Sequence, residues 1–355
     1  MDINTLVQTA ASLKASDLHL AWGQPPKIRV DGQLVDMPGM PALSDDDLED
    51  LARQMYGKDM PAEGERDLAM RVASRRVRVN IYRQRGHVSA ALRLLNDNIP
   101  DLDKLGLPDA VKSFPDLKRG IVLVTGETGS GKSTTLAAVL QRINETRHAH
   151  IITLEDPIEY EYTPDKCLID QREIGSDTSD YAAGLRAILR EDPDVILIGE
   201  MRDLETIETA LTAAETGHLV FATLHTASAG DSIDRIVGVF PADRQRQIRM
   251  QLSMTLMAVL SQQLLPRIGG GRVCACETMI VNPAIRNLIR EGNTPQITNT
   301  IATTASIGNI SMDNAVINLC RDGVIAPETT VSAARDYDFV KEKLHLGNMS
   351  NMRRR

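Results

Sequence analysis

The sequence is poor in the residue types that a nucleic-acid-binding surface requires. Aromatic residues make up 3% of its 355 residues, and acidic residues outnumber basic ones, which gives a formal net charge of −8. Proteins that bind nucleic acids neutralise phosphates with basic side chains and often stack aromatic rings on the bases. The composition therefore argues against a nucleic-acid translocase, although a local basic patch is compatible with this net charge.

Cysteine is scarce as well. The four cysteines include no C-x-x-C pair, so the sequence predicts neither a structural zinc site nor a disulfide scaffold. We interpret them as reduced thiols of a cytosolic protein. They are Cys167, Cys274, Cys276 and Cys320.

Long hydrophobic runs are also missing. The first residues contain Asp2 and no apolar core, unlike a signal peptide. No apolar run approaches the ~20 residues of a membrane-spanning helix. The nearest candidate, residues 250–265, is interrupted by glutamines and serines, and we expect it to form a buried amphipathic helix. Any contact with a membrane would then be made through a partner.

The first hundred residues have the pattern of an α+β domain. A serine followed by three aspartates, Ser44 to Asp47, is a typical helix start and predicts a helix through Tyr56. Apolar residues alternate with polar ones over 77–81, which indicates a half-buried strand. The remaining predicted elements are a helix over 2–14, a hairpin of strands 28–30 and 33–35 around Asp31-Gly32, and a strand over 87–95.

Beyond residue 118 strands alternate with helices, which is typical of a parallel sheet with helical crossovers. The predicted strands are 121–124, 151–154, 195–198 and 219–224, and the helices are 132–145, 179–190 and 204–216. The last hundred residues look mainly helical, with one strand near 273–281. We therefore predict an α/β protein with an N-terminal α+β domain (1–97), a proline-punctuated linker (98–118) and a parallel α/β domain with a helical C-terminal region (119–355).

A glycine-rich motif follows the strand 121–124. Residues Gly126 to Ser133 fit G-x-x-x-x-G-K-[ST] between an apolar strand and a helix, the context that identifies a P-loop. Backbone N–H groups and the helix N-terminus would hold the phosphates of ATP, Lys132 would reach the β- and γ-phosphates, and Ser133 would bind Mg²⁺. The predicted nucleotide-binding residues are Gly126, Thr128, Gly129, Ser130, Gly131, Lys132, Ser133 and Thr134.

Two acidic stretches lie at the ends of predicted strands. The strand 195–198 ends in Gly199-Glu200, with glycine where a magnesium-binding Asp is usual. We predict that Glu200 is the general base that activates water; an acid at a helix start is the alternative. The stretch from Glu155 to Glu159 carries three carboxylates in five positions. We predict that Glu159 faces Mg²⁺ or its water; a solvated acidic loop is the alternative.

Two histidines flank the strand 219–224. They are separated by seven extended residues, or roughly 23 Å, and cannot share one metal ion. His225, at the carboxyl end of the strand, is predicted to sense the γ-phosphate. His218, at the other end, is equally compatible with a structural role. His148 and His150 are interpreted as surface residues.

Seven arginines lie between Arg71 and Arg93, with Tyr82 as the one aromatic residue among them. In an ATPase whose first domain packs over a neighbour's nucleotide, such arginines could act in trans on the transferred phosphate. A solvated strand face is the alternative.

These motifs together resemble the motor ATPases of secretion and pilus systems, and within them the type IV pilus retraction ATPases of the PilT type. The resemblance runs from Ala15 to about residue 325. It includes the P-loop, the acidic box 152–159, the atypical strand end 199–203, and the histidine box from Thr216 to Thr226. Arg78 and Arg93 match N-terminal-domain arginines of the family. Residues 284–291, AIRNLIRE, match the retraction-type motif, and the zinc-binding cysteine pairs of assembly ATPases are absent.

The resemblance implies a PAS-like N-terminal domain, a RecA-like ATPase domain, and a cytoplasmic homo-hexamer that is peripheral at the inner membrane. Its catalytic residues would be Glu200, Glu159, His225, Arg78 and Arg93, acting on ATP with Mg²⁺. It would drive an inner-membrane platform protein so that pilin subunits leave the filament, with other pilus motor ATPases as potential partners and no nucleic acid. The alternatives are an accessory or assembly ATPase of a pilus or type II secretion-like system, or a scaffold that binds nucleotide but barely hydrolyses it.

Overall fold

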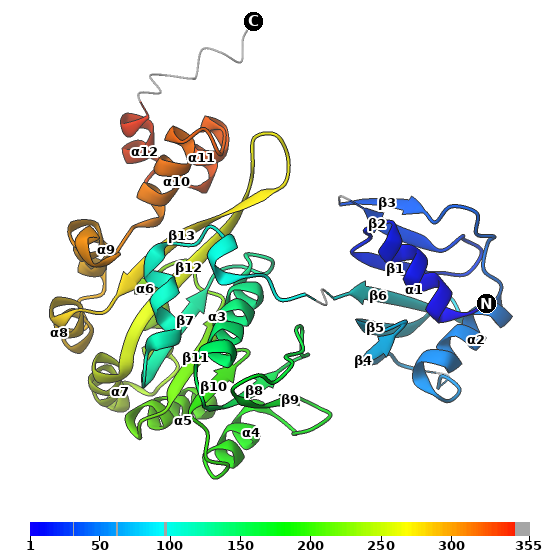
Figure 1. Ribbon diagram of the computed structural model, residues 1–355, viewed down its shortest axis with the longest axis horizontal. Coiled ribbons are helices and arrows are strands. Elements are labelled where there is room, and N and C mark those ends of the chain that lie inside the picture. The colour runs from blue at the N-terminus through cyan, green and yellow to red at the C-terminus, as the bar shows by residue number, and fades with distance from the viewer. Residues whose placement is uncertain (31, 62, 96–97, 345–355) are drawn as a thin grey trace, which may run out of the picture. The chain divides into compact units, whose positions relative to one another are not determined.

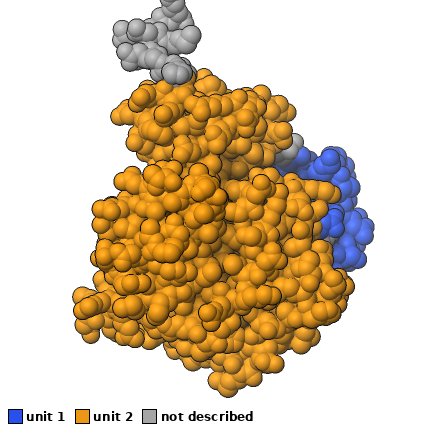
Figure 2. Space-filling view, turned by 60° about the vertical axis from the view of Figure 1, so that its left-hand side comes forward, with its two compact units in different colours: residues 1–98, 157–161 blue, residues 99–156, 162–355 orange. Residues whose placement is uncertain are grey.

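The computed structural model describes residues 1–344 except 31, 62, 96 and 97 (Figure 1). The chain forms two compact units, which are coloured separately in Figure 2. Unit 1 comprises residues 1–98 and 157–161, and unit 2 comprises residues 99–156 and 162–355. None of the described helices combines the length and apolar character that a transmembrane segment needs.

Unit 1 is built on a six-stranded antiparallel sheet, in the order β3-β2-β1-β6-β5-β4. Its strands are β1 (Asp17–Leu20), β2 (Lys27–Val30), β3 (Gln33–Asp36), β4 (Arg66–Val72), β5 (Arg75–Gln84) and β6 (His87–Leu94). Helices α1 (Ile3–Ser12) and α2 (Asp45–Tyr56) bury Leu6 and Leu48 in the same core as the strand residues Val79 and Leu92. This confirms the predicted α+β domain.

Local chemistry explains the elements of unit 1 that the sequence predicts. Ser44 and Asp47 cap α2 reciprocally: the Asp47 amide donates to Ser44 Oγ at 3.2 Å, and the Ser44 amide donates to Asp47 Oδ2 at 3.0 Å. The strands β2 and β3 pair as predicted, whereas Asp31 of their predicted turn lies outside the described residues. Strands β1 and β4 are too short or too polar in pattern to be recognised, so the prediction omitted them.

Unit 2 contains a seven-stranded sheet in the order β13-β12-β7-β11-β10-β8-β9. All neighbours are parallel except β12 and β13. The strands are β7 (Gly120–Thr125), β8 (His150–Glu155), β9 (Leu168–Glu173), β10 (Val195–Ile198), β11 (Leu219–Leu224), β12 (Leu256–Pro266) and β13 (Arg272–Ile280). Every residue of β7, β10 and β11 is buried, as expected of strands covered on both faces. The predicted α/β fold is confirmed.

Helices connect the parallel strands as crossovers. They are α3 (Lys132–Thr146), α4 (Tyr181–Ile188), α5 (Leu204–Glu215), α6 (Ala229–Gly238) and α7 (Ala242–Thr255). In such a sheet the loops at the carboxyl ends of the strands form the binding edge. The P-loop follows β7, Glu200 follows β10 and His225 follows β11, so the topology places all three at this edge.

The prediction of a helix over residues 250–265 is wrong beyond Thr255. Helix α7 ends there, and the chain continues as β12, which pairs with β7 on one side and with β13 on the other. A short apolar run such as Leu256 to Leu260 has the same composition in a buried helix and in a buried strand. Pairing with β7, which lies far away in the sequence, decides between them.

Residues 98–118, for which the sequence predicts a linker, join unit 2 from Ile99 onward. They form two 3₁₀ helices, η1 (Leu102–Lys104) and η2 (Asp109–Asp116). Phe114 is 1% exposed and packs in the same core as Val122 and Leu140. The segment is therefore built into unit 2 through its apolar side chains.

The C-terminal region is helical, as predicted. It comprises α8 (Pro283–Glu291), α9 (Pro295–Thr303), the 3₁₀ turn η3 (Ala305–Ile307), α10 (Met312–Arg321), α11 (Pro327–Ala333) and α12 (Tyr337–Lys343). Helix α8 begins at an Asn282 cap and ends at Gly292, whose φ of 74° suits glycine. Helices α10–α12 lie beside one end of the β12–β13 hairpin (Figure 1), where Met312 and Val316 pack with Leu265 and Ala275 in a small separate core. The four cysteines are free thiols.

Candidate active site

The loop from Gly126 to Ser133 wraps the N-terminus of α3. Gly126 has a φ of 140°, and a Cβ placed on it would lie 2.6 Å from Ser130 Oγ and collide with the backbone oxygen of Gln262. Gly131 precedes the helix with a φ of 97°. Side chains would strain or fill this turn, so glycines leave the backbone N–H groups and the positive end of α3 free to face an anion.

The Lys132 amine is drawn back into the loop. Its Nζ donates to the carbonyl oxygens of Gly126 at 2.8 Å and of Glu127 at 2.9 Å, and the residue is 9% exposed. Nearby, the Ser130 hydroxyl is buried and has no hydrogen-bond partner within the described part of the chain. A buried hydroxyl without a partner is costly unless a ligand satisfies it. The loop therefore has the donors and the geometry that a phosphate group requires.

A cavity of about 440 Å³ opens at this loop. The part of its wall formed by the P-loop is Gly126–Ser130, and the facing wall is formed by Ala227, Gln262–Leu265 and Ser332–Arg335. The volume is in the range of small-molecule sites. Ser133 and Thr134 lie in the first turn of α3, with Ser133 exposed and Thr134 half-buried. Ser133 can supply a hydroxyl ligand to a cation; the structure as described groups no three metal-ligating side chains together.

Glu200, which follows β10, is held between two basic side chains. Its Oε1 lies 2.6 Å from Arg202 Nε, and its Oε2 lies 3.4 Å from His225 Nε2. The carboxyl side chain is 18% exposed. Burial raises the pKa of Glu200, but the hydrogen bond from Arg202 and the neighbouring His225 outweigh it, so the net pKa is lowered. Glu200 is therefore ionised at neutral pH, the state that a general base requires.

The geometry explains why glycine precedes Glu200. A Cβ on Gly199 would lie 2.9 Å from Tyr181 Oη and 3.0 Å from the carbonyl oxygen of Leu154. Both contacts are closer than a Cβ normally allows. The Gly199 amide also donates to Leu154 O at 2.8 Å, which fixes the backbone there. Any side chain at this position would therefore have to displace Tyr181 or the backbone at Leu154, which favours glycine and leaves Glu200 as the first carboxylate after β10.

The two histidines beside β11 have different surroundings. His225 contacts Glu200 at the carboxyl edge, whereas His218 Nδ1 lies 2.9 Å from Ala213 O and 3.1 Å from Thr216 Oγ1 at the opposite end of the strand. Those contacts connect the end of α5 to β11, and we expect a structural role for His218 from them. His150 lies 2.9 Å from Asp170 and also contacts the backbone oxygen of Asp192 at 3.2 Å.

The acidic box is divided between the two units. Glu155 ends β8 and accepts hydrogen bonds from Thr153 Oγ1 at 2.7 Å and from Gln171 at 3.3 Å. Glu159 is exposed and belongs to residues 157–161, which group with unit 1. Its role toward Mg²⁺ stays a prediction.

The predicted N-terminal arginines form a row across the sheet of unit 1. Arg78 and Arg93 are directly opposite each other on β5 and β6, and Asp17 is opposite Arg93 on β1. Arg93 Nε donates to Asp17 Oδ1 at 3.1 Å. Burial raises the pKa of Asp17, but hydrogen bonds from Ser16 and Arg93 lower it overall. Like charges opposite each other are unfavourable. Asp17 lies beside this exposed arginine pair, but its carboxylate is also 3.9 Å from Arg29, so the pair keeps a net positive charge.

Several residues at the site were not predicted from the sequence. Arg202 and Tyr181 line a second cavity of about 500 Å³ beside Glu200. Burial, followed by the charges of Asp156 and Glu200, raises the pKa of Tyr181 above its ordinary value, so its hydroxyl stays protonated. The sequence signal that could have pointed to Arg202 is its position, two residues after Glu200 in the loop that follows β10. Arg335, in the wall of the first cavity, has no local motif.

Known proteins resemble this chain over most of its length. Residues 1–316 match the family described as "Type II/IV secretion system protein". The chain is 47% identical over 340 residues to the "Type IV pilus retractation ATPase PilT" of Pseudomonas aeruginosa, covering 94% of this chain and 98% of the relative. It is 35% identical to the "Type IV pilus ATPase PilU" of the same organism, covering 99% of this chain and 93% of PilU.

A solved structure gives the same result for the fold. A crystal structure of the pilus retraction motor PilT with bound ADP superposes with a TM-score of 0.89 at 45% identity, covering 96% of this chain and 99% of that one. These relatives confirm the resemblance that the motifs indicated.

Proposed function

Because the chain belongs to the family of type II/IV secretion system proteins, we propose that it is an ATP-hydrolysing motor that retracts a type IV pilus. The observation that carries the ATPase activity is the carboxyl edge of the unit 2 sheet, where Glu200 lies 3.4 Å from His225 and both follow strands adjacent in the sheet that also carries the P-loop. The pilus role is supported by the name of a relative that aligns over nearly the full length of both chains.

The residues of the site divide the reaction between them. Backbone N–H groups of Gly129 and Gly131, with Lys132, hold the β- and γ-phosphates and stabilise the charge that develops on them. Glu200 accepts a proton from water as the water oxygen attacks the γ-phosphorus, and the bond from that phosphorus to the bridging oxygen breaks, leaving ADP and phosphate. His225, beside Glu200, orients this carboxylate and reports whether a γ-phosphate is present.

The same site fits a magnesium ion. Mg²⁺ usually keeps several waters and takes one or two protein ligands together with phosphate oxygens. Ser133 would hold the ion, with Glu159 facing the ion or its water, and the ion would supply positive charge to the phosphates. The buried, unpartnered Ser130 hydroxyl supports a phosphate ligand in the adjoining loop.

The motor would work as a homo-hexamer at the cytoplasmic face of the inner membrane. The exposed pair Arg78 and Arg93 supports this arrangement, because a neighbouring subunit's nucleotide would compensate two like charges held side by side. ATP-driven motion between the two units would act on an inner-membrane platform protein and let pilin subunits leave the filament. Contact with the membrane would be made through that partner.

The experiment that tests the pilus role is deletion of the gene, with surface pili imaged directly. Hyperpiliated cells that have lost twitching motility support retraction, and bald cells would overturn it. Complementation with the wild-type gene and with a Lys132→Ala gene separates the need for ATP from the need for the protein. Only the wild-type gene is expected to restore motility.

A second candidate is an accessory or assembly motor that works beside a principal one. The observation in its favour is that Pseudomonas aeruginosa has two pilus ATPases similar to this chain, at 47% and 35% identity. Deletion of an accessory motor would leave pilus number near normal, with a defect visible only under load or together with loss of the other ATPase. Deletion of an assembly motor would give bald cells.

A further inference from the structure

The C-terminal helices form part of the nucleotide cavity. Residues Ser332–Arg335, at the end of α11, line the same cavity as the P-loop residues Gly126–Ser130. These residues lie beyond position 316, where the family match ends. Among the described residues that line this cavity, Arg335 contributes the positive charge.

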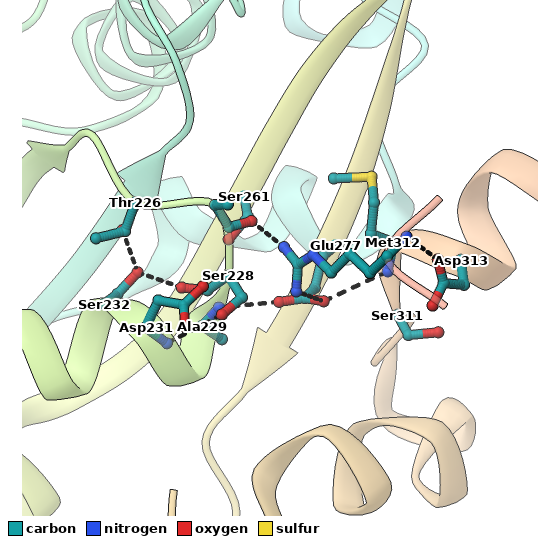
Figure 3. A network of polar contacts seen from close by, with 12 residues as sticks. Thr226, Ser228, Ala229, Asp231, Ser232, Ser261, Glu277, Ser311, Met312 and Asp313 are labelled. Carbon is teal, nitrogen blue, oxygen red and sulfur yellow. Dashed lines mark hydrogen bonds and ion pairs between the residues drawn. The ribbon is translucent and has the colours of Figure 1, made fainter. Parts of the chain in front are cut away.

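A buried carboxylate lies behind this wall. Glu277, in the middle of β13, is 2% exposed and accepts hydrogen bonds from the backbone amides of Ala229 at 2.9 Å and Met312 at 3.4 Å. Figure 3 shows Glu277 between Ala229, at the start of α6, and Met312, at the start of α10. A carboxylate that is withdrawn from water in this way needs a cation as well as hydrogen bonds.

Arg335 supplies that cation and makes a second contact. Its Nη1 lies 2.9 Å from Glu277 Oε2, and its Nη2 donates to the backbone oxygen of Ala227. Its own backbone amide donates to Asp313 Oδ1 at 2.7 Å. Asp313 lies in the first turn of α10, so this hydrogen bond anchors Arg335 to α10. One guanidinium therefore joins β13 to the loop before α6, from a position anchored on the C-terminal helices.

The loop that these contacts hold is the one that carries His225. Ala227 and Ala229 are two and four residues after His225. Arg335 binds the backbone oxygen of Ala227, and Glu277 binds the backbone amide of Ala229. Thr226 is held in the same stretch by a hydrogen bond of 2.6 Å with Ser232 Oγ. A loop fixed on its carboxyl side has less freedom to move His225 away from Glu200.

We propose that Arg335 is a positioning residue: with Glu277 it forms a clamp that holds the loop from His225 to Ala229 and so keeps His225 beside Glu200. The clamp also ties α10 and α11 to the nucleotide cavity, so a displacement of these helices would change ATP turnover. The effect on turnover rests on the proposed ATPase activity. The effect on the loop does not.

The two singly substituted chains Arg335→Gln and Glu277→Gln test the clamp in the full-length protein. In each, we expect kcat to fall about tenfold while KM for ATP changes by less than about threefold, because the phosphate-binding loop is left intact. The double variant is expected to be no worse than the more affected single one, since both changes remove one interaction. Arg335→Lys, which keeps the charge with Glu277, is expected to recover part of kcat.

A second readout follows the loop directly. Hydrogen exchange at the Ala229 amide is expected to be faster in Glu277→Gln and Arg335→Gln than in the wild type. The matched control is Arg321→Gln, because Arg321 lies on α10 and contacts only the Lys343 backbone oxygen, at 3.2 Å, among the contacts described for it. Arg321→Gln should leave both kcat and the Ala229 exchange rate unchanged.

The outcomes separate the possibilities. Unchanged kcat together with unchanged exchange at Ala229 would overturn the clamp. A rise in KM without a fall in kcat would also overturn it, since that result describes a direct nucleotide contact. If the wild type itself does not hydrolyse ATP, the proposed function fails, and the exchange measurement alone then decides whether the clamp exists.

Discussion

The two walls of the nucleotide cavity are built in different ways. The P-loop wall consists of consecutive residues, and its main internal contacts are from Lys132 to the neighbouring Gly126 and Glu127. The facing wall gathers residues from the loop before α6, from β12 and from the end of α11. The first wall is continuous in the sequence, so a single motif supplies its phosphate-binding groups. The second depends on the whole fold, and it carries Arg335 of the proposed clamp.

The largest effect is expected when the P-loop loses its charged side chain. Lys132→Ala should reduce ATP turnover by at least about 10²-fold, because a preorganised charge on the transferred phosphate is removed. Phosphate release at saturating ATP measures it. Lys112→Ala is the control, since Lys112 pairs with Asp109 in η2 outside the cavity. An equal loss of turnover in both variants would mean that turnover does not depend specifically on the Lys132 charge.

The histidines at the two ends of β11 provide a second comparison. His225→Ala should lower turnover by about 10- to 100-fold, equivalent to one hydrogen bond to a charged group. His218→Ala should leave turnover intact and lower the free energy of unfolding by about 1 kcal/mol, because only the contacts with Ala213 and Thr216 are lost. Turnover and urea unfolding measured on both variants test this. The reverse pattern would place the catalytic histidine at the His218 end of β11 and contradict the role proposed for His225.

Gly199→Asp tests whether the unusual strand end is imposed by packing. The new side chain should collide with Tyr181 Oη and Leu154 O and destabilise the fold by about 1–3 kcal/mol, with lower turnover. Gly199→Ala should have a smaller effect of the same sign. Urea unfolding measures both. A stable Gly199→Asp protein with faster hydrolysis would show that the position accepts the acid usual in other P-loop enzymes.

The smallest effect concerns pH. Arg202 lowers the pKa of Glu200 by a hydrogen bond to its charged form. Arg202→Met removes this stabilisation, so the pKa of Glu200 should rise toward or above the ordinary 4.5 and the acid limb of kcat/KM should move to higher pH. Turnover near neutral pH should change little. An acid limb that stays in place would mean that Glu200 is not the group that titrates.

The same contrast explains what the sequence predicts well. The P-loop, the α2 cap and the alternating strand around Val79 depend on neighbours within a few positions, and all three were predicted. The strand β12 and the Glu277–Arg335 pair depend on partners at least 50 residues away, such as β7 for β12 and Arg335, 58 residues on, for Glu277. Neither hydrophobic periodicity nor composition identifies such distant partners. Glu200 and His225 were predicted because parallel strands bring their carboxyl ends together.

The most direct test of the central claim is the number of surface pili on cells whose chromosomal gene carries Glu200→Gln. If the protein is the retraction motor and Glu200 is its general base, the variant will bind ATP without turning it over, and the cells will be hyperpiliated and will not twitch. Bald cells, or cells with normal pilus numbers and normal twitching, would contradict the account.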